Sequence, residues 1–137
     1  MPRKSKNSNL LYKSSKNVIE LSPKDFHVKD LKKGMMPLKG EPVIVVYYAH
    51  WCPHCHSEEM TQLWDALGHS LKNKTNIKTA AFNADLNDSH RQIAQNIGIQ
   101  GFPTIKFYNN NNVDEYMGPR EPKDILMFLH NALKKHS

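Results

Sequence analysis

Apolar residues along this chain fall into short runs that predict a β-sheet. Residues 43–48 are β-branched or aromatic throughout, which is typical of a central strand covered on both faces. Residues 18–21 and 77–82 are further strand candidates. Residues 104–108 and 113–116 flank a run of four asparagines, a pattern that predicts a hairpin with a polar turn.

Three helices are predicted between and after these strands. The first presents one apolar stripe at i, i+3, i+4, i+7 and i+11, formed by Met60, Leu63, Trp64, Leu67 and Leu71. The second begins near Asp88 or Ser89, runs through Ile93 to Ile97 and ends at Gly98. The third follows Pro122 and is expected to bury Ile125, Phe128, Leu129 and Leu133. Because a crossover through the first helix makes its two flanking strands parallel, the predicted fold class is α/β, a mixed central sheet with helices on both faces.

The composition adds a division of the chain. With 137 residues and 39% hydrophobic content, one domain is expected. The net charge is +6, but five basic residues, Arg3, Lys4, Lys6, Lys13 and Lys16, precede the first acid, Glu20. We therefore expect residues 1–17 to be a basic, disordered leader and residues 18–137 to be a nearly neutral domain. This charge distribution argues against a nucleic-acid partner.

No targeting signal is visible in the sequence. The leader lacks the apolar core of a secretory signal, the longest apolar run, residues 43–49, is too short to span a bilayer, and the C-terminal four residues form no retention signal. We expect a monomer without a membrane span, located in the cytoplasm or packaged in a viral particle rather than secreted.

The candidate chemistry lies in two cysteines three positions apart, Cys52 and Cys55. They stand where the buried strand gives way to the first helix, so peptide N–H groups and the helix dipole favour a thiolate at Cys52. A protonated His54 adds a second positive charge, and Pro53 shapes the turn. Both charge effects favour the reduced pair, so the disulfide should tend to oxidise other thiols. This chemistry requires no cofactor.

Three motifs, taken together, resemble the thioredoxin superfamily, and protein disulfide isomerase is its nearest branch. They are Tyr48-Ala49-His50-Trp51-Cys52-Pro53-His54-Cys55, Ile99-Gln100-Gly101-Phe102-Pro103-Thr104 and Gly118-Pro119-Arg120. The resemblance covers about residues 18–135. It implies a thioredoxin fold in which Cys52 attacks and Cys55 resolves.

The same resemblance assigns further roles to neighbouring residues. Pro103 is implied to follow a cis peptide bond and to face the cysteines. Phe102 is implied to pair with a substrate backbone, in a substrate site that also includes Trp51, Pro53 and Pro103. Arg120 is implied to swing toward Cys55 and lower its pKa. The Pro-His dipeptide between the cysteines matches the strongly oxidising DsbA type.

The chain departs from the family at three positions. Val46 stands where the family buries a carboxylate that accepts a proton from the second thiol, and Ala81 stands where a lysine partner is frequent. Deprotonation of Cys55 is then left to water, Glu58 or Glu59. Met60 replaces a proline that kinks the helix, so a straighter helix is expected.

The sequence therefore predicts a thiol-disulfide oxidoreductase that acts on protein or peptide thiols and disulfides, leans toward oxidation or isomerisation and depends on an unidentified redox partner. The alternatives are a general disulfide reductase, a substrate-holding module with little turnover, and a metal-binding module. The last arises because His50, Cys52, His54, Cys55 and His56 crowd into seven residues. Zinc needs four converging donors, however, and His54 and His56 diverge on a helical turn, so no metal is predicted.

Overall fold

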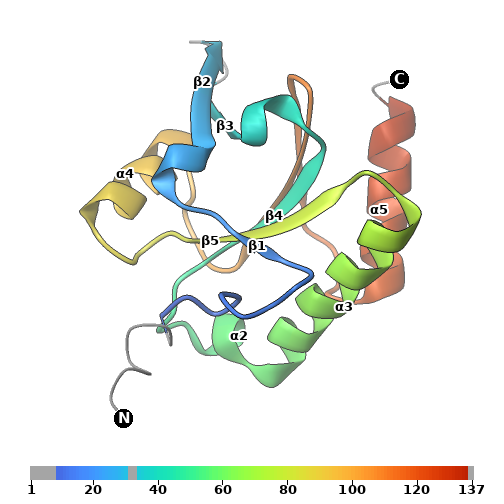
Figure 1. Cartoon of the computed structure of the whole chain (residues 1–137), viewed down its shortest axis with the longest axis horizontal. Coiled ribbons are helices and arrows are strands. Elements are labelled where there is room, and N and C mark those ends of the chain that lie inside the picture. The colour runs from blue at the N-terminus through green and yellow to red at the C-terminus, as the bar shows by residue number, and fades with distance from the viewer. Residues whose placement is uncertain (1–8, 31–33, 136–137) are drawn as a thin grey trace.

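The computed structural model describes residues 9–30 and 34–135, which fold around a five-stranded sheet (Figure 1). The strands lie in the order β1-β5-β4-β6-β7. Their bounds are β1 Ile19–Glu20, β4 Val43–Tyr48, β5 Lys78–Asn83, β6 Thr104–Asn109 and β7 Asn112–Tyr116. β4 and β1 run parallel to β5, whereas β6 runs antiparallel to β4 and to β7. The predicted mixed sheet and terminal hairpin are confirmed.

Helices cover both faces of this sheet, as predicted. They are α2 Pro53–His56, α3 Glu58–Lys74, α4 Asp88–Ile97 and α5 Pro122–Lys135. Figure 1 shows α3 and α5 on one side of the sheet and α4 on the other. None of the helices in the described part of the chain combines the length and apolar composition that a membrane crossing requires.

The central strand β4 explains why there are two cores. All six of its residues are buried, and they alternate between the faces. Ile44, Val46 and Tyr48 join the core beneath α3 and α5, while Val43, Val45 and Tyr47 join the core beneath α4. The predicted stripe of α3 packs on the first of these cores, with Leu63 only partly buried.

The end of α4 agrees with the sequence prediction, whereas the buried face of α5 differs from it at one position. Gly98 ends α4 in the left-handed conformation, with φ of 87°, as its position predicted. In α5, Leu133 is 39% exposed, so its predicted burial is wrong. Ala132 is buried instead, because it lies seven residues after Ile125 and shares its face of the helix.

A two-stranded sheet above the main one was not predicted. β2 Phe26–Asp30 pairs antiparallel with β3 Gly34–Pro37, and the short 3₁₀ turns Pro23–Asp25 and Leu38–Gly40 flank the pair. Phe26 and Met36 are buried in the core beneath α4. The residues between them are mostly polar and do not show the apolar alternation of a strand, so this hairpin is recognised only from the tertiary structure.

The first helix is not straight, and the expectation of a straighter helix is wrong. Ser57 separates α2 from α3 with φ of −65° and ψ of 151°, which is extended backbone. Its hydroxyl accepts a hydrogen bond from the Met60 N–H at 3.2 Å, and Glu58 and Glu59 occupy the first turn of α3. A serine N-cap followed by acids starts a new helix, so no proline is needed to produce the break.

The expected disordered leader is wrong for residues 9–17, whereas residues 1–8 lie outside the described part of the chain. Tyr12 is 4% exposed and packs edge-on against Tyr48, with the ring centroids 5.9 Å apart. Ser15 donates a hydrogen bond to Asp65 of α3 at 2.5 Å. Apolar burial and side-chain hydrogen bonds of this kind make residues 9–17 part of the folded domain.

Candidate active site

The two cysteines lie directly after the C-terminal end of β4, at the start of α2. Cys52 is the N-cap of α2, Pro53 occupies the first helical position, and the Cys55 N–H donates to the Cys52 carbonyl at 3.0 Å. Proline suits this position because the first helical N–H would have no partner within the helix. Both cysteines are free thiols, and Cys52 is 6% exposed whereas Cys55 is 1% exposed. Cys52 is therefore the more accessible sulfur.

The loop before β6 brings a second motif to the same place. The Phe102–Pro103 peptide bond is cis, as predicted. The Cys52 thiol donates to the Phe102 carbonyl oxygen, with the sulfur and oxygen 4.0 Å apart. β4 pairs with β6, and Tyr47 lies opposite Thr104, so the end of one strand meets the beginning of the other. Sheet pairing thus places residues 50 positions apart beside one another.

Trp51 presents an aromatic surface next to Cys52. It is 57% exposed, and its ring meets the Phe102 ring edge-on at 5.9 Å between centroids. The indole Nε1 donates to Asp85 Oδ2 at 2.6 Å, and Arg91 pairs with Asp85 Oδ1 at 3.0 Å. The bond from Trp51 is the main cause that lowers the pKa of Asp85. Asp85 was missed from sequence, because a polar residue in a loop carries no spacing signal that links it to Trp51.

His54 and Arg120 face a cavity beside the cysteines. This cavity of about 640 Å³ is bordered by α2, the first turns of α3 and the residues that lead into α5. Its lining includes His54, Glu59 and Arg120, all of them exposed. The cavity therefore brings two predicted site residues, 66 positions apart in the chain, to one surface.

Cys55 is held as a thiol by its surroundings. Burial is the main cause that raises its pKa to about 12, and the hydrogen bond with the Cys52 side chain acts in the same direction. The Ala49 backbone and the positive charge of Arg120 lower the pKa, which is the direction expected for Arg120. Because the raising effects dominate, Cys55 needs a base before it can act as a nucleophile.

The two positions at which the family carries buried charges are neighbours in the sheet, and here both are uncharged. Val46 of β4 pairs with Ala81 of β5, and both are buried. On the other side of β5, Ala81 pairs with Glu20 of β1. Burial raises the pKa of Glu20 to about 7. Glu20 was missed as a site candidate, although an acid within the apolar run Val18 to Leu21 was a visible signal.

The metal-binding alternative requires several of its suggested donors to converge. Among residues 9–30 and 34–135, no three histidine, cysteine or acidic side chains cluster closely enough to hold a metal ion. One of the suggested donors, His50, is hydrogen-bonded to Asn83 through Nδ1 at 3.0 Å.

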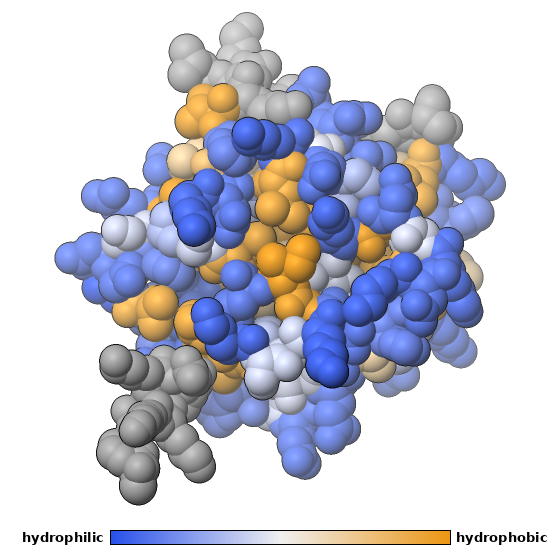
Figure 2. Space-filling view, viewed as in Figure 1, coloured by the Kyte–Doolittle hydropathy of each residue, from blue (hydrophilic) through white to orange (hydrophobic). Residues whose placement is uncertain are grey.

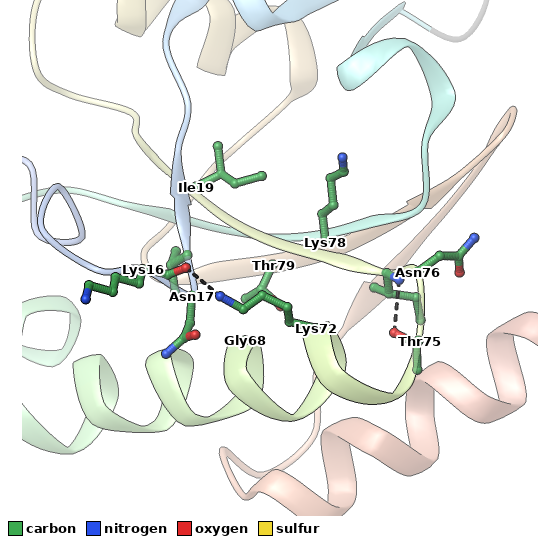
Figure 3. Close-up of a pocket in the computed structure, with 11 residues that line it drawn as sticks. Lys16, Asn17, Ile19, Gly68, Lys72, Thr75, Asn76, Lys78 and Thr79 are labelled. Carbon is green, nitrogen blue, oxygen red and sulfur yellow. Dashed lines mark hydrogen bonds between the residues drawn. The ribbon is translucent and has the colours of Figure 1, made fainter.

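A second cavity lies away from the cysteines, between β1, β5 and α3 (Figure 3). It has a volume of about 280 Å³ and is bordered by Thr79, whose buried hydroxyl has no hydrogen-bond partner among the described residues. Lys16 and Lys78, which border it, extend in different directions (Figure 3). Figure 2 shows apolar side chains at the centre of the face that carries β1. Because no predicted site residue borders this cavity, we assign it no part in the cysteine chemistry.

The thioredoxin family model matches residues 17–131. The chain belongs to the thioredoxin family. Protein disulfide-isomerase like 2-2 of Arabidopsis thaliana is 35% identical over 127 residues, which cover 92% of this chain and 26% of that protein. Protein disulfide-isomerase A6 of Homo sapiens is 34% identical over 129 residues, with 93% and 26% coverage. This thioredoxin-family chain therefore spans about a quarter of the length of these relatives.

Solved structures show the same fold. The J-Trx1 fragment of ERdj5 matches with a TM-score of 0.69 at 18% identity, over 90% of this chain and 55% of that one. The Trx4 domain of ERdj5 matches with a TM-score of 0.65 at 20% identity, over 87% and 97%. The predicted thioredoxin fold is confirmed, and together with the cysteine spacing and the curated relatives it supports thiol-disulfide oxidoreductase chemistry.

Proposed function

We propose that this domain exchanges thiols and disulfides on protein or peptide substrates, with oxidation or isomerisation as its direction. The observation that carries the proposal is the position of Cys52 Sγ, 4.0 Å from the carbonyl oxygen that precedes cis Pro103. A substrate chain that pairs with the Phe102 backbone would lie alongside this sulfur.

In oxidation, a substrate thiolate attacks Cys52 Sγ in the Cys52–Cys55 disulfide. A bond forms between the substrate sulfur and Cys52, and Cys55 leaves as a thiolate that takes up a proton. A second substrate thiolate then attacks the substrate sulfur of this mixed disulfide, so the substrate gains a disulfide and Cys52 leaves as a thiolate. The substrate loses two electrons and the cysteine pair gains them, and a redox partner then reoxidises the pair.

In isomerisation, the reduced pair begins the reaction. The Cys52 thiolate attacks a substrate disulfide, and one substrate sulfur leaves as a thiolate. That thiolate attacks another bond of the substrate, or Cys55 displaces the substrate from Cys52. The accessible Cys52 and the more deeply buried Cys55 suit these separate roles, because only the attacking sulfur must meet the substrate.

Side chains around Cys52 support a substrate site. Trp51 and Phe102 form an edge-on aromatic pair beside the cysteine, and Trp51 remains more than half exposed. Aromatic surface of this kind contacts an extended peptide at low entropic cost. His54 and Arg120 border one cavity, and the positive charge of Arg120 acts to lower the pKa of Cys55.

Two cysteine variants test the proposal. Cys52→Ser should abolish both insulin reduction and oxidation of reduced ribonuclease. Cys55→Ser should accumulate mixed disulfides with these substrates, because the attacking sulfur remains but its resolving partner is gone. Mass spectrometry under non-reducing conditions detects the adducts, and circular dichroism checks that both variants fold. A Cys52→Ser protein with wild-type turnover would contradict the proposal.

The same two assays separate the alternatives. Faster ribonuclease oxidation than insulin reduction supports the oxidising direction, and the reverse supports a general reductase. If neither substrate turns over but both still bind, the domain holds substrates without exchanging their disulfides.

A further inference from the structure

The exchange cycle leaves one proton without an acceptor. Cys55 must lose a proton before it can displace a substrate from Cys52, yet burial raises its pKa to about 12. The strand position that would carry an acid is Val46, and its neighbour Ala81 carries no charge. Glu58 and Glu59 are exposed on the first turn of α3. A buried acceptor, as distinct from these exposed acids or water, has to come from another element.

Glu20 lies on the face of the sheet that carries the cysteine pair. It is the register partner of Ala81, which in turn pairs with Val46, so the three residues lie side by side on neighbouring strands. Partners in a parallel register direct their side chains to the same face. Ala81 and Val46 both belong to the core that contains Cys55, beneath α3 and α5. The carboxylate of Glu20 therefore lies on the same face of the sheet as position 46, but two strands away, on β1 rather than β4.

Both carboxylate oxygens of Glu20 are held by residues of that core. Oε2 accepts from the Tyr48 hydroxyl at 2.7 Å, and Oε1 accepts from the Tyr12 N–H at 2.9 Å. Lys13 is the cation whose charge favours the ionised form, but burial outweighs it and raises the pKa of Glu20 to about 7. A group with this pKa can both accept and return a proton near neutral pH.

Tyr12 is hydrogen-bonded to Glu20 through its backbone and is buried in the same core as Cys55. Burial is the main cause that raises the pKa of Tyr12, and the charges of Glu20 and of an ionised Cys55 act in the same direction. Asp65 acts on the same phenol in the same direction. Tyr12 also packs edge-on against Tyr48, the hydrogen-bond donor to Glu20.

We propose that Glu20, acting through Tyr12, is the internal proton acceptor for Cys55 and replaces the carboxylate absent from position 46. The inference rests on the proposed exchange function. When a mixed disulfide resolves, the Cys55 thiol proton passes to the Glu20 carboxylate. The Cys55 thiolate attacks Cys52 Sγ, the intramolecular disulfide forms, and the substrate leaves as a thiolate. In the oxidising direction the leaving Cys55 thiolate takes the proton back.

Stopped-flow reaction of the reduced protein with 2,2′-dithiodipyridine separates the reaction of Cys52 from that of Cys55. Attack by Cys52 releases a first pyridinethione, and displacement by Cys55 releases a second, so each step has its own absorbance phase. Glu20→Gln should change the rate of the first phase by less than about twofold and slow the second phase by about tenfold or more at pH 7 to 8. The wild-type second phase should show an inflection near pH 7 that this variant lacks.

Two further variants distinguish a proton acceptor from a structural support. Tyr48→Phe keeps the carboxylate but removes a hydrogen bond that lowers the pKa of Glu20, so the inflection should move to higher pH. Glu41→Gln makes the same chemical change at an exposed acid that pairs with Lys78, and it should leave the second phase unchanged.

The outcomes identify which claim fails. A Glu20→Gln second phase equal to wild type at every pH would overturn the role of Glu20. If that variant does not fold, an unmoved inflection in Tyr48→Phe overturns it instead. A wild-type protein with no first phase would contradict the exchange function itself, and this result is distinguishable from both of the others.

Discussion

The indole Nε1 of Trp51 donates a 2.6 Å hydrogen bond to Oδ2 of Asp85, and this bond ties the aromatic residue beside Cys52 to the loop after β5. Asp85 is held in turn by Arg91 of α4, which also pairs with Asp88 at 2.8 Å. The aromatic surface of the candidate site therefore depends on an element from the opposite face of the sheet.

Removing this support should weaken substrate binding more than chemistry. We expect Asp85→Ala to raise the KM for insulin about three- to tenfold with little change in kcat, because the indole loses a charge-assisted hydrogen bond that orients it. Asp88→Ala is the matched control, since Asp88 contacts Arg91 but makes no contact with Trp51. Steady-state kinetics measure the effect, and equal KM values for the two variants would show that Asp85 does not position Trp51.

His54 should set the redox potential of the cysteine pair. His54 lies between the two cysteines in the sequence, and a positive charge there would stabilise a thiolate, so His54→Gly should make the pair more reducing by about 30 mV or more, a tenfold change in the equilibrium constant. Equilibration with glutathione buffers measures the potential. His56→Gly controls for the added backbone freedom, because His56 is also exposed on α2 but follows Cys55. An unchanged potential in His54→Gly would remove this role.

Glu20 should make the stability of the domain depend on pH. Since its pKa is raised from 4.5 to about 7 by burial, the folded state keeps a proton that the unfolded chain has already released between these values. The free energy of unfolding contributed by Glu20 therefore falls as pH rises from about 4.5 to about 7 and then stays level.

The difference between wild type and Glu20→Gln isolates this contribution. It should change by about 2 kcal/mol across that window, less than the full pKa shift implies, because solvent reaches Glu20 at the edge strand. Urea unfolding at pH 5 and pH 8 measures it. Burial lowers the pKa of His90, but this effect is present in both proteins and cancels. A difference independent of pH would contradict the raised pKa.

Gly68 should be required for the docking of the N-terminal segment. A Cβ at this position would lie 2.3 Å from the Asn17 carbonyl oxygen, so Gly68→Ala must push residues 9–17 away from α3. We expect a loss of about 1 to 3 kcal/mol of stability and faster proteolysis within residues 9–17. Gly101→Ala is the control, because a Cβ there meets no heavy atom within 4 Å. Equal proteolysis rates would show that the segment is not held by this contact.

Much of the fold was predictable because its signals are local. An apolar run such as Val43 to Tyr48 and the stripe that includes Trp64 and Leu71 each follow from one segment alone. The break at Ser57 was also encoded locally, by a serine cap before two acids, but the helical stripe outweighed it in the prediction. The β2–β3 hairpin and the burial of Ala132 instead depend on neighbours distant in sequence.

The sequence by itself determined the reactive pair, the Gly-Phe-Pro-Thr motif and the sheet that joins them, because residue type, spacing and strand periodicity act over short stretches of chain. Only the tertiary structure decided that Asp85 holds Trp51, that Tyr12 belongs to the core and that Glu20 lies on the face of the missing acid. These contacts join residues 8 to 61 positions apart, and strand register and burial, which arise from the packed fold, bring them together.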